Sequence, residues 1–106
     1  MELEKWLEKY NVKSMVLKNC KFYLNQYKEE DEEDFNESFK DIDWEEVSYE
    51  FHSVSYVINT WHREDDDVYK YISAKVRLEY DDTTFAEYEA IYDFQGNLVE
   101  DYLRYC

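Results

Sequence analysis

The sequence predicts an α+β fold in which N-terminal helices pack on a four-stranded antiparallel sheet. Apolar residues recur every three or four positions up to residue 46, and at every second position in the runs from Val47 onward. The chain has 106 residues, of which 44% are hydrophobic, and this suits one domain with its own core. We therefore expect a single domain over 1–106, with a helical and acidic segment over 1–46 and the sheet over 47–106.

Helix is predicted over the first 28 residues. Apolar and aromatic side chains recur there at helical spacing: Leu3, Trp6, Leu7, Tyr10, Val16, Cys20, Tyr23, Leu24 and Tyr27. The pattern fits one bent helix, or two helices with a break at Asn11 and a cap at Ser14.

A further short helix is predicted over 32–46. Phe35, Phe39 and Ile42 are spaced by four and three, so they share one helical face. A second face carries an acidic stripe, which consists of Asp34, Glu37, Asp41 and Glu45. Acids at this spacing repel each other by a few tenths of a kcal/mol per pair, so the stripe costs stability and indicates a function.

The first strand is predicted to contain a β-bulge. Apolar side chains alternate on odd positions from Val47 to Phe51 and on even positions from Val54 to Ile58. A change of phase inside one run is typical of an extra residue in the strand, here near His52–Ser53. A sheet that bends at this point can curl around a helix.

A hairpin turn is predicted at Asp81–Thr83. A three-residue loop there pairs Tyr80 with Thr84 and places Arg77 opposite Glu87. Opposite charges then face each other across the strands, which supports the register.

A second hairpin is predicted at Phe94–Asn97, which contains the single glycine of the chain. A two-residue loop there pairs Tyr92 with Val99 and places Arg104 opposite Glu87. Glu87 would then lie between two arginines on the outer face of the sheet.

The composition excludes several classes of function. A single Gly rules out glycine-rich phosphate loops and the nucleophile elbow of hydrolases. No apolar run reaches the ~20 residues of a membrane span, and no secretion signal is evident. Neither Asp31–Asn36 nor Asp65–Lys70 supplies the glycine of a calcium-binding loop. We expect no metal, no cofactor and no enzymatic activity.

Cys20 and Cys106 lie too far apart in the sequence for a C-x-x-C redox or zinc motif. In the absence of a secretion signal we expect reduced thiols and a location in the cytoplasm. A disulfide between the two is the alternative.

The charge of the chain is large and uneven. Acidic residues number 27 against 12 basic, which gives a formal net charge of -15. The net charge is +3 over 1–28, -11 over 29–50 and -7 over 51–106. Such acidity disfavours nucleic acids and anionic membranes as direct partners and favours a basic protein.

A partner-binding surface is expected where acids and tyrosines gather. Acids three or four positions apart on a helix are about 5–6 Å apart between Cβ atoms, which is the scale of phosphate spacing along a nucleic acid strand. Tyrosine is enriched at protein interfaces. The candidate residues are Glu29, Glu30, Asp31, Glu33, Asp34, Glu37, Asp41, Glu45, Asp65, Asp66, Asp67, Tyr69 and Tyr71.

In its acid run over 29–34 and its acidic stripe, the chain resembles the small acidic DNA-mimic inhibitors of phages and mobile elements. Anti-CRISPR proteins and inhibitors of restriction or repair enzymes belong to this class. The resemblance implies an inhibitor that occupies the nucleic-acid-binding groove of a basic protein, such as an RNA-guided nuclease, in the cytoplasm of a bacterial host.

Two alternatives are consistent with the same sequence. The first is an immunity protein that neutralises a cognate toxin, because toxic nucleases also have basic active sites. The second is a small ligand-binding or enzymatic domain, since helices followed by a curved sheet resemble cystatin-like and NTF2-like architectures. Asp101, which falls opposite Ala90 on the apolar face, would then line a pocket with Tyr88, Tyr92 and Trp61. The plainer interpretation is that Asp101 protects an edge strand from aggregation.

Overall fold

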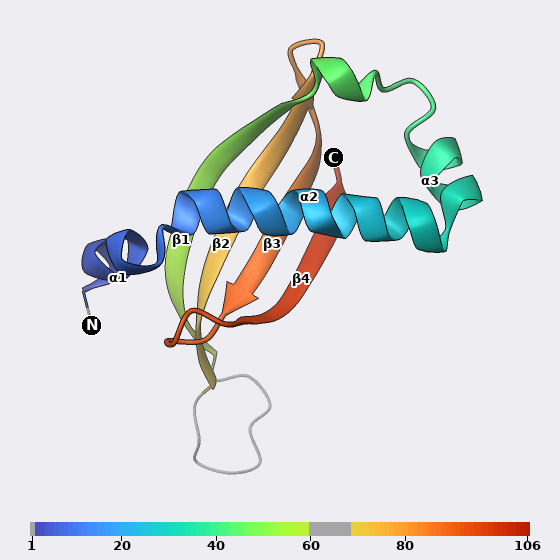
Figure 1. The fold of residues 1–106 in the computed structure, drawn as a ribbon. Coiled ribbons are helices and arrows are strands. Elements are labelled where there is room, and N and C mark those ends of the chain that lie inside the picture. The colour runs from blue at the N-terminus through green and yellow to red at the C-terminus, as the bar shows by residue number, and fades with distance from the viewer. Residues whose placement is uncertain (1, 60–68) are drawn as a thin grey trace.

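The chain folds as three α-helices followed by a four-stranded antiparallel sheet, in the part of the chain that the computed structural model describes, residues 2–59 and 69–106 (Figure 1). This confirms the predicted α+β class. The elements are α1 (Leu3–Tyr10), α2 (Val12–Glu30), α3 (Glu32–Ser38), a 3₁₀ turn η1 (Trp44–Glu46), β1 (Ser48–Asn59), β2 (Tyr69–Tyr80), β3 (Thr83–Tyr92) and β4 (Leu98–Tyr105). No helix of the described residues combines the length and the apolar character that crossing a bilayer requires.

The first two helices are separate and meet at Asn11. This residue has φ 48° and ψ 57°, which is the left-handed region that asparagine tolerates better than most residues. The break at Asn11 is therefore as predicted, but the predicted cap at Ser14 is wrong, because α2 already begins at Val12.

The sheet has the strand order β1-β2-β3-β4, so every strand pairs with its neighbour in the sequence. The pairing of β1 with β2 shifts between Phe51 and Ser53, which confirms the predicted bulge. The bulge returns Val54 to the face of the sheet on which Phe51 lies, opposite Ala74.

The turn between β2 and β3 is shorter than predicted. Its two residues, Asp81 and Asp82, have positive φ angles of 53° and 60°. Positive φ at both central residues is typical of the type I′ turn, which is common in two-residue hairpin loops. Tyr80 consequently pairs with Thr83, and the predicted pairing with Thr84 is wrong.

A bulge in each hairpin restores the rest of the predicted register. Phe85 is the extra residue of β3, and beyond it Arg77 pairs with Glu87 as predicted. Val99 is the extra residue of β4, and beyond it Glu87 pairs with Arg104 as predicted.

Next to the second turn, the predicted strand pairing differs from the observed pairing by one residue. Tyr92 pairs with Leu98, and the predicted pairing with Val99 is wrong. The reason is a longer loop, in which the Asp93 carboxylate accepts hydrogen bonds of 2.9 Å from the backbone N–H groups of Gln95 and Asn97.

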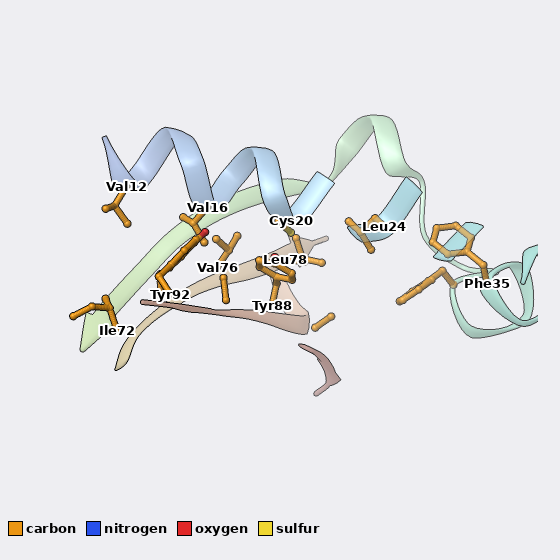
Figure 2. Close-up of a cluster of buried hydrophobic side chains, with 14 of the residues drawn as sticks. Val12, Val16, Cys20, Leu24, Phe35, Ile72, Val76, Leu78, Tyr88 and Tyr92 are labelled. Carbon is orange, nitrogen blue, oxygen red and sulfur yellow. The ribbon is translucent and has the colours of Figure 1, made fainter. Parts of the chain in front are cut away.

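The core lies between α2 and the concave face of the sheet. In Figure 2, Val12, Val16, Cys20 and Leu24 point from one side of α2 toward the strands. The sheet side chains beneath them are fully buried: Ile72, Ala74, Val76, Leu78, Ala86, Tyr88, Ala90 and Tyr92. Full burial of a single aliphatic side chain contributes about 1.5–3 kcal/mol, so this contact is the main source of stability.

The predicted helix over 32–46 is wrong in its second half. α3 ends at Ser38, and only η1 is helical after it. The chain turns because Phe35, Phe39 and Trp44 pack together, with ring centroids 5.0 to 5.5 Å apart. A continuous helix would also have placed the acids of 41–46 at its C-terminal end, where the partial negative charge of the helix repels them.

The loop between β3 and β4 packs against α1. The Trp6 indole N–H donates a 3.0 Å hydrogen bond to the carbonyl of Phe94. Gly96 has φ +84°, and a Cβ atom added to it would lie 2.6 Å from the Tyr10 ring. Both the backbone conformation and the available space therefore require glycine at this position.

We expect Gly96→Ala to lower the free energy of unfolding by about 2 kcal/mol, from left-handed strain together with the clash on Tyr10. Urea denaturation would measure this change. In a Tyr10→Ala background the cost should fall to about 1 kcal/mol, because only the backbone strain remains. An equal cost in both backgrounds would show that the Tyr10 contact contributes nothing.

Candidate functional site

An exposed band of acids runs from the end of α2 through α3 to η1, along the chain seen at the right and top of Figure 1. We call it the acidic arc. It consists of Glu29, Glu30, Asp31, Glu32, Glu33, Asp34, Glu37, Asp41, Asp43, Glu45 and Glu46. All eleven side chains are exposed, and only one base, Lys40, lies within the segment.

Four residues of the acidic arc gather at α3. Asp31, Glu33, Asp34 and Glu37 line a shallow cleft of about 400 Å³. Asp31 caps the helix by accepting a 3.3 Å hydrogen bond from the backbone N–H of Asp34. All four were predicted as partner-binding residues, and α3 brings them to one place.

The Asp34 carboxylate is held from α2, since the Tyr27 hydroxyl donates a hydrogen bond to it. This hydrogen bond raises the pKa of Tyr27, because it favours the protonated phenol. Asp34 is therefore a fixed member of the acidic arc, whereas Glu33 and Glu37 extend into solvent.

The predicted acidic stripe does not exist as one helical face. Asp34 and Glu37 belong to α3, but Asp41 lies in the turn after it and Glu45 lies in η1. The stripe required a helix through 46, and the aromatic packing of Phe39 ends that helix early.

The structure adds acids that the candidate list did not include. Glu46, Glu79, Asp81 and Asp82 line a second cleft, of about 360 Å³, where η1 meets the turn between β2 and β3. Ser48 pairs with Glu79 at this end of the sheet. The β1–β2 register could have revealed this neighbourhood, because it places the start of β1 beside the end of β2.

Three cations of the sheet, Lys75, Arg77 and Arg104, are paired with carboxylates on its outer face, away from the acidic arc. Arg104 lies 2.7 Å from Glu89, and Glu87 contacts Arg77 at 3.4 Å and Lys75 at 3.9 Å. Among residues 2–59 and 69–106, no carboxylate of the acidic arc forms an ion pair with a base. Its negative charge is therefore not neutralised by the described part of the chain.

The remaining candidates are on or next to β2. Tyr71 is half-buried opposite Val57, so it is less exposed than predicted. The backbone of Tyr69 begins β2 opposite Asn59. The Tyr69 side chain and the run Asp65, Asp66 and Asp67 lie outside the described residues, as does Trp61.

Asp101 lies on the inner face of the edge strand β4, where it was predicted. Its carboxylate accepts a 2.7 Å hydrogen bond from the Tyr88 hydroxyl. Tyr88 is fully buried, and the Tyr23 ring of α2 packs against its edge at 5.7 Å. Burial, with the hydrogen bond to Asp101, raises the pKa of Tyr88. Packed side chains of α2 therefore occupy the space in which the expected Asp101 pocket would lie.

Neither metal coordination nor similarity to known proteins adds a further assignment. Within the described segments, no three His, Cys, Asp or Glu side chains come together as a metal-ligand set. Comparison of the chain with protein-family models, with curated proteins and with solved structures gives no match. The site must therefore be interpreted from its own chemistry.

The two cysteines are free and differ in environment. Cys20 is fully buried on the side of α2 that faces the sheet, whereas Cys106 is exposed. Burial raises the pKa of Cys20 to about 12, so its thiol stays protonated and unreactive at neutral pH.

We expect Tyr88→Phe to lower the free energy of unfolding by about 2 kcal/mol, because it leaves the half-buried Asp101 without its donor. Asp101→Asn should cost less, since an amide oxygen can still accept. Chemical denaturation of both single variants and of the double variant would measure the coupling. Tyr80→Phe is the matched control, and a loss no larger for Tyr88→Phe would contradict this role of the hydrogen bond.

The cysteine environments predict selective labelling. In the native protein a thiol reagent should modify Cys106 rapidly and Cys20 only under denaturing conditions. The folded pKa of Cys20 is raised above its unfolded value, so its contribution to stability is complete below about pH 9 and is lost between about pH 9 and 12. Rapid labelling of both thiols in the native state would contradict this assignment.

Proposed function

We propose that this chain is a non-enzymatic inhibitor that binds a basic, nucleic-acid-binding protein through the acidic arc. One observation supports the proposal above the others: eleven exposed carboxylates lie within residues 29–46 and lack basic partners within the described residues. A groove that binds phosphates through lysines and arginines offers the complementary charge. The chain would block such a groove by occupying it in place of nucleic acid.

The acidic arc has the physical properties that this role needs. Exposed carboxylates act beyond contact distance, because charges are screened over about 8–10 Å at ordinary ionic strength. Uncompensated negative charge accelerates encounter with a positive surface by roughly 10- to 1,000-fold. The cap at Asp31 and the hydrogen bond on Asp34 fix part of the acidic arc in advance, which reduces the entropy lost on binding.

The partner class we favour is an RNA-guided nuclease in the cytoplasm of a bacterial host, which makes this an anti-CRISPR-type inhibitor. An immunity protein for a toxic nuclease would use the same surface, and the neighbouring genes would separate the two. A ligand pocket on the concave face of the sheet is less favoured, since α2 covers that face.

The first experiment is a capture assay with tagged protein. Purified RNA-guided nucleases and toxic nucleases would be tested in parallel, and bound protein would be eluted in a salt gradient. We expect a basic partner whose elution depends on salt and whose nucleic acid binding is blocked. If no nuclease is retained, or if retention is indifferent to salt, the proposal is wrong.

Charge reversal tests the surface itself. Glu33→Lys with Glu37→Lys should weaken binding to the captured nuclease by about ten-fold or more, measured as a dissociation constant at fixed salt. The matched control is Glu4→Lys with Glu8→Lys, which makes the same change in net charge on exposed positions of α1. Equal losses in both variants would mean that net charge alone, and not the acidic arc, governs binding.

A further inference from the structure

A cleft of about 270 Å³ opens between α2, α3, η1 and the start of β1. Lys21, Asn25 and Lys28 lie along its α2 side, spaced by four and three residues, so they share one helical face. Their side chains are exposed at the mouth of the cleft. The cleft is thus edged by two ammonium groups and one amide.

The interior of the cleft is apolar and aromatic. Leu24 and Phe35, both labelled in Figure 2, are each 5% exposed and line the cleft. Trp44 stacks on Phe35, with centroids 5.5 Å apart and planes at 22°. Tyr49 of β1 completes the lining. The rings of Phe35 and Trp44 are fixed by their contacts with Phe39, so this side of the cleft is pre-formed.

The lysines are unusual for a chain with a net charge of -15. Within the described residues neither Lys21 nor Lys28 forms an ion pair with a carboxylate. Lys21 Nζ lies 5.0 Å from the centroid of the Tyr49 ring, and Lys28 lies in the last turn of α2, where a cation is favourable. Both ammonium groups still have donors available for an anion at the cleft.

We propose that this cleft binds a small aromatic anion, with its ring against the half-buried Trp44 and Tyr49 and its carboxylate or phosphate between Lys21 and Lys28. Ammonium groups are compact donors that suit both anions, and stacked rings favour a planar apolar body. The volume of the cleft suits a ligand with one ring and one anionic group. Such a ligand is smaller than a drug-sized molecule. The site is independent of the acidic arc, since its charged groups are cations.

The test is a titration followed by two-dimensional NMR of the full chain, with phenyl phosphate and phenylacetate as separate probes. We expect saturable shifts at Leu24, Trp44 and Tyr49 with one or both, at a dissociation constant on the order of 1 mM or tighter. The two probes distinguish a phosphate from a carboxylate ligand. Inorganic phosphate and benzyl alcohol each lack one half of the proposed ligand and should bind more weakly.

Lys21→Gln with Lys28→Gln should weaken binding by about ten-fold. Lys13→Gln with Lys18→Gln is the matched control, because it removes two exposed charges from the same helix outside the cleft. Lys28→Gln alone is the test if the double variant does not fold, since Lys28, unlike Lys21, has no cation–π contact among the described residues. Absence of saturable shifts, equal binding of benzyl alcohol, or equal loss in the control variant would overturn the proposal.

Discussion

The structure depends on the contact between α2 and a sheet bent enough to receive it. Val12, Val16, Cys20 and Leu24 form a row with a spacing of four, and this row needs a concave partner along its whole length. The bulge after Phe51 helps to supply the curvature by changing the phase of β1. Three buried alanines of β2 and β3 allow the helix to approach closely.

This contact also determines where function can reside. With the concave face filled by α2, the side chains left for a partner lie on the helices, on the turns and on the outer face and edges of the sheet. Phe35, Phe39 and Trp44 hold the chain after α2 through ring contacts with each other and with Phe85. Because a few aromatic anchors fix this segment, the other positions are free to carry acids. Two of these anchors, Phe35 and Trp44, also line the lysine-edged cleft.

The sequence was sufficient for the fold class, the bulge in β1 and most of the strand register, because these follow from alternation of apolar residues and pairing of opposite charges. The clearest example of such charge pairing is Glu87, which lies between Arg77 and Arg104. The lengths of the two turns were harder to predict from the sequence. A bulge at Phe85 and another at Val99 each compensate for a wrong loop length, so the charge pairs are the same with either length.

The acidic stripe failed for a different reason. Helical spacing of Asp34, Glu37, Asp41 and Glu45 is a local signal, whereas the end of α3 is decided by contacts of Phe39 with rings distant in the sequence. The four acids around α3 lie together because they are close in the chain, and their role in binding a partner stays a prediction. The cleft edged by Lys21 and Lys28 combines residues of four elements, so no local pattern indicates it.

The uneven charge along α2 and the segment after it affects how the molecule orients in an electric field. Lysines 13, 18, 21 and 28 lie along this helix, while the acidic arc begins at its C-terminal end. The charge therefore changes sign along this part of the chain, from positive on α2 to negative beyond its end. In the field of a cationic surface such a molecule rotates before it touches, so that the α3 end arrives first. Orientation before contact shortens the search for a productive encounter, even when the final interface is small.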